Sequence, residues 1–263
     1  KDGENLAVLQ LQSSLSVSSA DDIEAFRFEN LVIKVDAQDF FKFKDQEFHI
    51  GTISWKNCEI NDLQRTMWYQ ETNADRQQTV DKVLIENCRF FGLNSGKSGF
   101  FGLSTKQDAP IHRFEFRNST FHANDMTKAL ITGVSKMKGN LDVVVENCTF
   151  IAMKAGMTFF DLKPSNADNF NVTVKNNLFS GVSDGASGTW INLGNVTTRT
   201  INNNYITNGF TLNNWGVEEN EKPMETTLPM DGLFQDVNGR DFTITDNNSE
   251  IYTNNIGDPH WIK

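Results

Sequence analysis

An asparagine recurs about every 29 residues along most of this 263-residue chain, each time at the end of a short segment of alternating apolar and polar residues. The successive spacings are 27, 30, 31, 29, 29 and 27 residues. The repeated residues are Asn30, Asn57, Asn87, Asn118, Asn147, Asn176 and Asn203. A period of two is typical of β-strands, and Val, Ile and Phe fill the apolar positions. The chain is therefore a series of repeated units that each begin with a strand.

A unit of this length with no helical stripe cannot bury its own apolar face, so it must stack on its neighbours. Equivalent residues then lie about 4.8 Å apart, one strand spacing, and should be chemically alike. One apolar column has this likeness; it contains Phe28, Trp55, Ile85, Phe116, Val145, Val174 and Ile201. We predict an all-β fold, a right-handed parallel β-helix of about seven or eight coils.

The repeated asparagines are predicted to form a structural ladder at a turn between two strands. Asparagine tolerates the left-handed backbone conformation, and its side-chain amide can bond to the amide one coil above. Further apolar segments predict a third strand in each coil. Its outward column would contain Lys42, Gly102, Thr132, Asp161 and Asn192.

The residue before each ladder asparagine alternates in charge from coil to coil. This column contains Glu29, Lys56, Glu86, Arg117, Glu146 and Lys175, and a second column places Glu59 beside Arg89. Opposite charges at strand spacing form cross-strand ion pairs, each worth about 0.2 to 1 kcal/mol. We interpret both columns as structural.

The repeat also predicts the domain organisation. Residues 1–25 precede the first clear unit and are predicted to form an N-terminal cap, and residues 26–263 form the β-helix domain. The asparagine spacing lengthens after Asn203, which indicates an acidic loop insertion at about residues 211–240. Trp261, near the chain end, is predicted to close the bottom of the core, because solenoids need capped ends.

Composition excludes several classes of partner. The net charge of −10 and the pI near 4.9 argue against nucleic acid, which needs a clustered basic face. No stretch approaches eighteen consecutive apolar residues, so we expect no membrane-spanning segment.

Two sequence features resemble known families. The repeated V-x-V-x-N-C/S-x-F unit resembles the pectate-lyase-like β-helix superfamily over roughly residues 26–263. The closing sequence IGDPHW, residues 256–261, resembles the end of a domain of unknown function in surface lipoproteins of gut bacteria that use polysaccharides. The resemblance implies an exported bacterial protein, at the cell surface or in the periplasm, that meets complex carbohydrate. Fold alone does not carry an activity.

The catalytic sets of related enzymes are not evident in the sequence. Calcium-dependent lyases of the superfamily need converging carboxylates, whereas the charged column alternates acid with base. Hydrolases need a pair of carboxylates at a defined separation. The histidines His49, His112, His122 and His260 do not accompany a repeated acid. We therefore assign no catalytic residue, no metal and no cofactor.

The third strand offers the best candidate ligand-binding residues. Asp161, Lys163 and Asn192 fall on adjacent coils, where an acid, an amine and an amide can hold sugar hydroxyls. The alternative is a solvated ion pair without function. Trp215, in the acidic insertion, and Trp68 with Tyr69, in a predicted loop, are candidates for stacking on sugar rings, although burial against the β-helix is an alternative.

Three cysteines share one column directly after the ladder. Cys58 and Cys88 fall on adjacent coils, within reach of a disulfide, whereas Cys148 is two coils from Cys88. No histidine joins this column, so we interpret the cysteines as small buried side chains and not as metal ligands.

Three functions remain as hypotheses. The leading one is an exported β-helix protein that binds a polysaccharide or oligosaccharide without evident catalysis. The second is a polysaccharide lyase, or less favourably a glycoside hydrolase, that acts on acidic glycans. The third is a structural stalk or adhesin in which the coils act as a spacer.

Overall fold

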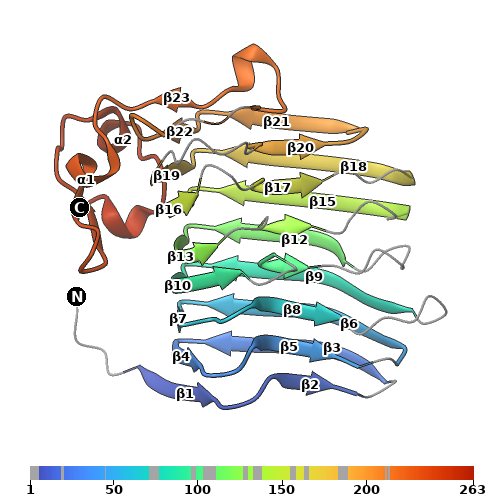
Figure 1. The fold of residues 1–263 in the computed structure, drawn as a ribbon. Coiled ribbons are helices and arrows are strands. Elements are labelled where there is room, and N and C mark those ends of the chain that lie inside the picture. Colours follow the sequence, from blue (N-terminus) through green and yellow to red (C-terminus); the bar gives the residue numbers. More distant parts are fainter. Residues whose placement is uncertain are drawn as a thin grey trace.

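The computed structural model describes residues 6–18, 21–44, 46–70, 77–95, 99–102, 111–126, 130–132, 138–154, 158–162, 166–182, 189–210, 212 and 214–263. It confirms the all-β parallel β-helix fold. Strands follow one another around the molecule and stack along its axis (Figure 1). All strand pairs between coils are parallel. Each coil contributes one strand to each of three sheets, here named A, B and C in chain order.

Sheet A follows the ladder turn and contains nine strands within the described residues. They are β1 (Ala7–Leu11), β4 (Leu31–Val35), β7 (Glu59–Asn61), β10 (Arg89–Ser95), β13 (Thr120–Met126), β16 (Thr149–Lys154), β19 (Leu178–Val182), β22 (Tyr205–Ile206) and β23 (Met224–Glu225). The last strand comes from the predicted loop insertion and pairs with β22.

Sheets B and C each contain seven strands within the described residues. Sheet B consists of β2 (Leu15–Val17), β5 (Asp39–Phe43), β8 (Thr66–Gln70), β11 (Phe101–Gly102), β14 (Ile131–Thr132), β17 (Phe160–Leu162) and β20 (Ile191–Leu193). Sheet C consists of β3 (Asp22–Glu29), β6 (Phe48–Lys56), β9 (Gln78–Glu86), β12 (Ile111–Arg117), β15 (Lys138–Glu146), β18 (Asn166–Lys175) and β21 (Thr198–Asn202).

The core is made of columns of like side chains, as the repeat predicts. Phe90, Phe121, Phe150 and Phe179 stack face to face with ring centroids 5.1, 5.1 and 4.8 Å apart and interplanar angles of 10° or less. All four side chains are fully buried. Offset stacks of this kind add about 0.5 to 1.5 kcal/mol per pair to the free energy of burial.

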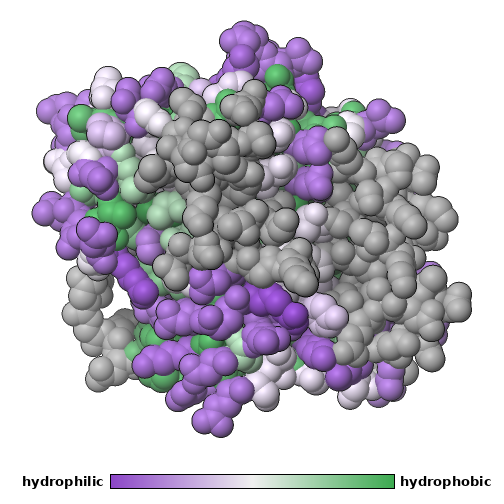
Figure 2. Space-filling view, viewed as in Figure 1, coloured by the Kyte–Doolittle hydropathy of each residue, from purple (hydrophilic) through white to green (hydrophobic). Residues whose placement is uncertain are grey.

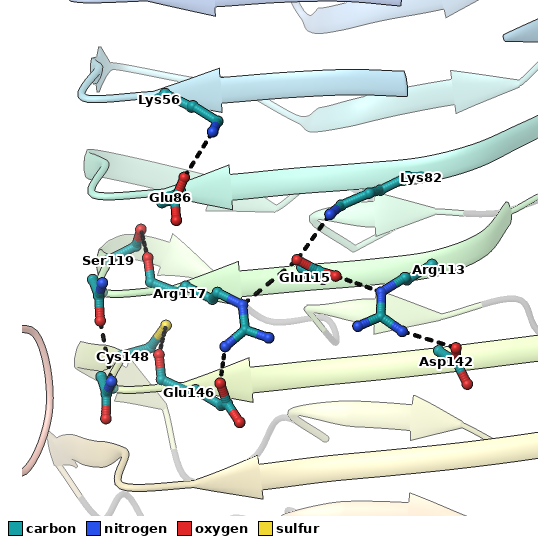
Figure 3. A network of polar contacts seen from close by, with 12 residues as sticks. Lys56, Lys82, Glu86, Arg113, Glu115, Arg117, Ser119, Asp142, Glu146 and Cys148 are labelled. Atoms are coloured by element: carbon teal, nitrogen blue, oxygen red, sulfur yellow. Dashed lines mark hydrogen bonds and ion pairs between the residues drawn. The ribbon is translucent and has the colours of Figure 1, made fainter. Parts of the chain in front are cut away.

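The alternating charges outside sheet C form ion pairs at three of the five expected steps within the described residues. Lys56 Nζ lies 3.0 Å from Glu86, and Arg117 bonds to Glu146 (Figure 3). Lys175 Nζ lies 3.0 Å from the same Glu146. The second column pairs Arg89 with Glu59 at 3.4 Å.

A denser part of this network surrounds Glu115, which is only 7% exposed. Three cations contact its carboxylate: Lys82, Arg113 and Arg117 (Figure 3). Burial opposes the shift, but the bonds from Arg113 and Lys82 lower the pKa of Glu115.

The residues after sheet A form a second, lateral core. Residues 226–263, here called the C-terminal segment, contain α1 (Met230–Leu233), β24 (Phe234–Asp236), β25 (Asp241–Ile244), α2 (Glu250–Thr253) and the 3-10 helix η3 (Pro259–Trp261). The segment lies beside β16 and β19 rather than above or below the stack (Figure 1). Its buried side chains pack on outward residues of sheet A, namely Phe91, Ile151, Leu178 and Tyr205.

This arrangement corrects the expected place of Trp261. The tryptophan is 6% exposed and belongs to the lateral core, where its Nε1 donates to Thr120 Oγ1 of β13 over 2.7 Å. It covers the side of the β-helix in the middle of sheet A instead of closing the bottom. The prediction was wrong because it treated the chain end as the end of the stack.

Two further predictions about loops need correction. Trp68 and Tyr69 lie in strand β8 and not in a loop, and Trp68 is fully buried. The stretch at about residues 211–240 also contains more than loop, since it includes β23, β24, α1 and the 3-10 helix η2 (Glu219–Glu221).

The outer surface formed by the described residues is largely polar. Among the described residues, Val8 and Met224 are the exposed large hydrophobic side chains. Hydrophilic residues occupy much of the coloured surface in Figure 2. No helix in the described part of the chain is long and apolar enough to cross a membrane.

Candidate functional site

The structure brings together two of the residues that the sequence selected. Asp161 of β17 and Asn192 of β20 are register partners on sheet B. Asn192 Nδ2 donates to Asp161 Oδ1 over 2.8 Å, and both side chains are partly buried. Their amide and carboxylate therefore satisfy each other in part. A role of this pair in binding stays a prediction.

The other two selected residues do not complete a site with them. Lys163 lies outside the described residues. Trp215 is partly buried against the main core, with its ring centroid 6.3 Å from that of Trp190. The backbone oxygen of Trp215 accepts from Ile191 N, so this residue extends sheet B by one more coil. Its ring packs on the β-helix, which was the alternative to sugar stacking.

The asparagine ladder is formed as predicted. All seven ladder asparagines have φ between 48° and 56°, the left-handed conformation. The backbone N–H of Asn57 donates to Glu86 O in the next coil, and other ladder positions repeat this bond. Side-chain amides join Asn57 to Asn30, Asn87 to Asn57, Asn147 to Asn118 and Asn203 to Asn176, over 2.8 to 3.2 Å.

The amide ladder is interrupted at two places. Within the described residues, no side-chain hydrogen bond joins Asn87 to Asn118 or Asn147 to Asn176. At the first interruption the Asn87 amide oxygen and the Asn118 amide nitrogen lack the ladder partner that their equivalents have. Both asparagines line one cleft together with residues of the C-terminal segment.

Two threonines of sheet A anchor the C-terminal segment beside the ladder. Thr120 Oγ1 donates to Asp258 Oδ2 over 2.7 Å, and Thr149 Oγ1 accepts from the backbone N–H of Asp258 over 2.8 Å. Both threonines are buried, so these bonds are shielded from water. Asp258 also accepts from His260 N and thereby begins the helix η3.

A cleft of about 390 Å³, here called the ladder cleft, separates the ladder from this anchor. It is lined by Asn57, Cys58, Asn87, Arg89, Asn118, Asp258, Pro259 and His260. The side-chain groups available in it include amides, a guanidinium, an imidazole and a carboxyl group. The ladder cleft is therefore a polar site with both hydrogen-bond donors and acceptors.

The ladder cleft contains both a guanidinium group and a buried carboxyl group. Arg89 Nη1 lies 3.1 Å from His260 Nε2, while its other amino group lies 3.4 Å from Glu59. Burial raises the pKa of Asp258 to about 6, against the opposing effect of bonds from His260 N and Thr120 and of the Arg89 charge. Perturbed groups in a cleft are typical of functional sites.

Sequence reasoning missed the cleft residues of the chain end. The sequence predicts a solvated or turn histidine at His260. It also predicts that Arg89 pairs with Glu59, and the structure contains this pair. The available signal is the sequence IGDPHW, in which Asp-Pro-His marks a capped turn. Spacing alone does not reveal that this turn meets the ladder of coils far away in sequence.

Metal binding finds no support in the described residues, where no three His, Cys, Asp or Glu side chains converge as ligands. The half-buried histidine His122 instead packs against Phe91 and Phe242 in the lateral core. Burial lowers its pKa to about 4, so it is neutral at pH 7.

Fold and site together define a parallel β-helix protein with a lateral cleft. The family model of a domain of unknown function, DUF5123, matches residues 143–261, which is less than half of the chain. The match ends at Trp261 and includes Asp258 and His260 but not the ladder residues Asn57, Asn87 and Asn118. No curated protein and no solved structure matches the chain.

Proposed function

We propose that the protein binds an oligosaccharide, a piece of a complex polysaccharide, in the ladder cleft. The observation that carries the proposal is the interruption of the amide ladder between Asn87 and Asn118 inside the cleft. At most other steps the ladder amides satisfy each other. At this point an acceptor and a donor are available to a ligand instead.

The chemistry of the lining supports a hydroxyl-rich ligand. Amide groups donate and accept at once, as a sugar hydroxyl also does, so each can form paired hydrogen bonds. The volume of about 390 Å³ is within the range of small-molecule sites. A largely apolar ligand would leave the lining amides unpaired, which costs about 1 to 3 kcal/mol for each group.

The charges favour an acidic sugar over a neutral one. Arg89 lines the cleft beside the His260 imidazole, and a guanidinium matches the geometry of a carboxylate. Glu59 neutralises part of the Arg89 charge, and the whole chain carries a net charge of −10. The attraction for a uronate should therefore come from the cleft and not from the charge of the whole chain, and it should weaken with salt.

We also propose that the protein acts at a bacterial cell surface or in the periplasm. The support is the resemblance of the repeat to the pectate-lyase-like superfamily and of IGDPHW to surface lipoproteins, together with a polar outer surface. Cell fractionation with an antibody to the chain tests this. Recovery in the cytoplasmic fraction alone would contradict the proposal.

Calorimetric titration with oligogalacturonate and with a neutral oligosaccharide of equal length tests the binding proposal. We expect binding of the uronate, at least about tenfold weaker binding of the neutral chain, and a loss of at least about tenfold for Arg89→Gln. Arg199→Gln is the matched control, because Arg199 is also a partly exposed, ion-paired arginine but lies on β21 away from the cleft. Equal losses in both variants would contradict the assignment.

The same mixtures distinguish binding from catalysis. If unsaturated ends or new reducing ends accumulate, the protein is a lyase or a hydrolase, and the pure binding function is wrong. Asn192→Ala tests the second candidate surface. If this variant abolishes binding while Arg89→Gln does not, the ligand sits on sheet B at Asp161 and Asn192.

A further inference from the structure

One pair of thiols is placed differently from every other side chain in its column. The residue after each ladder asparagine points inward, and where it is a cysteine it bonds to the backbone of its own turn. Cys58 Sγ donates to Lys56 O, Cys88 Sγ to Glu86 O and Cys148 Sγ to Glu146 O, over 3.2 to 3.3 Å. All three cysteines are buried and reduced.

Only the first two cysteines have a thiol as their neighbour in the column. Cys58 and Cys88 occupy adjacent coils, since Cys58 precedes Glu59, the register partner of Arg89. The two thiols are close enough to shift each other's pKa. Ser119 occupies the next position and separates Cys88 from Cys148. Neighbouring parallel strands bring equivalent residues to the separation that a disulfide bridges.

The two thiols also differ in access. Cys58 lines the ladder cleft although its side chain is only 2% exposed, whereas Cys88 is fully buried and is not part of the lining. The neighbouring Cys88 thiol lowers the pKa of Cys58 to about 7, and burial raises the pKa of Cys88 well above its ordinary value. A thiolate at the cleft suits the role of the attacking thiol in thiol–disulfide exchange, and a neighbouring protonated thiol suits the role of the resolving thiol.

We propose that Cys58 and Cys88 form a redox-active dithiol that a small disulfide oxidises through the ladder cleft. The Cys58 thiolate attacks one sulfur of the oxidant and expels one thiolate, leaving a mixed disulfide. Cys88 then loses its proton and attacks Cys58 Sγ, which expels the second thiol. The protein dithiol thus gives two electrons and two protons to the small disulfide, which leaves as two thiols.

The resulting disulfide would fix two neighbouring coils to each other in the lining of the ladder cleft. Cys148 makes the same backbone bond without a neighbouring thiol, and burial raises its pKa strongly. It is therefore an internal control for burial. The exchange requires the two thiols alone, so it is independent of whether the cleft binds a sugar.

Oxidised glutathione and the intact chain test the proposal. After incubation, alkylation and peptide mapping, we expect two of the three thiols to disappear, a Cys58–Cys88 link, and a free Cys148. In Cys88→Ser, Cys58 should accumulate as the mixed disulfide with glutathione, at least about tenfold faster than Cys148 reacts. In Cys58→Ser, both remaining thiols should stay free.

The wild-type chain alone can overturn the proposal. It is wrong if all three thiols stay free under conditions that fully oxidise dithiothreitol, or if Cys148 reacts as fast as Cys58. Cys148→Ser should behave as the wild type does, with one thiol fewer at the start. Circular dichroism of each variant confirms that the β-helix is present.

Discussion

The β-helix and the C-terminal segment both bury apolar side chains, but by contacts of different kinds. In the β-helix a side chain meets its own equivalent one coil away, as in the stack from Phe90 to Phe179. In the C-terminal segment single contacts join distant parts of the chain. One example is the hydrogen bond from Trp261 to Thr120, which is 141 residues away in sequence. The β-helix is stabilised by many equivalent contacts, whereas the C-terminal segment depends on a few residues. The ladder cleft lies where the two regions meet.

The largest expected effect is on the repeated core. Phe121→Ala removes the middle of the stacked column and leaves a cavity between Phe90 and Phe150. We expect the free energy of unfolding to fall by about 3 to 5 kcal/mol, as measured by urea unfolding. A loss below about 1 kcal/mol would show that neighbouring coils close the gap, and it would make the repeat more adaptable than proposed.

A comparable change in the lateral core should act locally. Trp261→Ala removes a buried ring and its bond to Thr120, so we expect the C-terminal segment to lose about 3 kcal/mol of stability and to become protease-sensitive. The β-sheet signal in circular dichroism should persist. If that signal disappears at the same temperature as the segment is cleaved, the two regions unfold together.

The pH dependence of stability should also distinguish the lateral core from the β-helix. The pKa of His122 is about 4 in the folded lateral core and about 6.5 when unfolded, so only the unfolded chain gains a proton between these values. The contribution of neutral His122 to the free energy of unfolding is fully present above pH 6.5 and is lost as pH falls toward 4. We expect His122→Phe to gain about 2 kcal/mol relative to the wild type over this range, after allowance for solvent screening.

Urea unfolding of both proteins at several pH values measures this gain. Asp258 titrates with the opposite sign, because its folded pKa is raised to about 6, but it is present in both proteins and cancels. Parallel pH profiles would mean that His122 is not buried as neutral imidazole.

The ladder turn should show a smaller, residue-specific effect. Asn147 has a φ of 53° and donates to Asn118 Oδ1. Asn147→Ala should cost about 1 to 2 kcal/mol, because alanine is strained in this conformation and lacks the amide. Asn147→Gly should cost less, since glycine adopts the conformation freely. Thermal unfolding of both variants distinguishes backbone strain from the lost amide bond.

The smallest effect is expected at the charged column. Lys175→Met removes one ion pair from Glu146, which keeps its bond to Arg117. We expect a loss of at most about 0.5 kcal/mol, and less in high salt. A loss above about 1 kcal/mol would show that the charges of sheet C stabilise the fold as a connected network.

The β-helix and the C-terminal segment also differ in how far the sequence predicts their contacts. The ladder from Asn30 to Asn203 and the ion pair of Glu59 with Arg89 repeat at a fixed spacing, so their contacts follow from the fold itself. The strand that contains Trp68 escaped prediction because Thr66–Gln70 is a short strand that leads into polar residues. The contact of Asp258 with Thr120 has no counterpart in another coil, so periodicity carries no information about it.

Native-state hydrogen exchange in the wild-type chain tests the contrast between the two regions most directly. The amides of Ile256 and Gly257 in the C-terminal segment and of Phe116 and Val145 in sheet C can be followed while urea is added. We predict that the segment exchanges through a separate opening of lower free energy, while the sheet exchanges by global unfolding. If all four amides exchange with the same free energy and the same urea dependence, the molecule has one cooperative unit and the distinction fails.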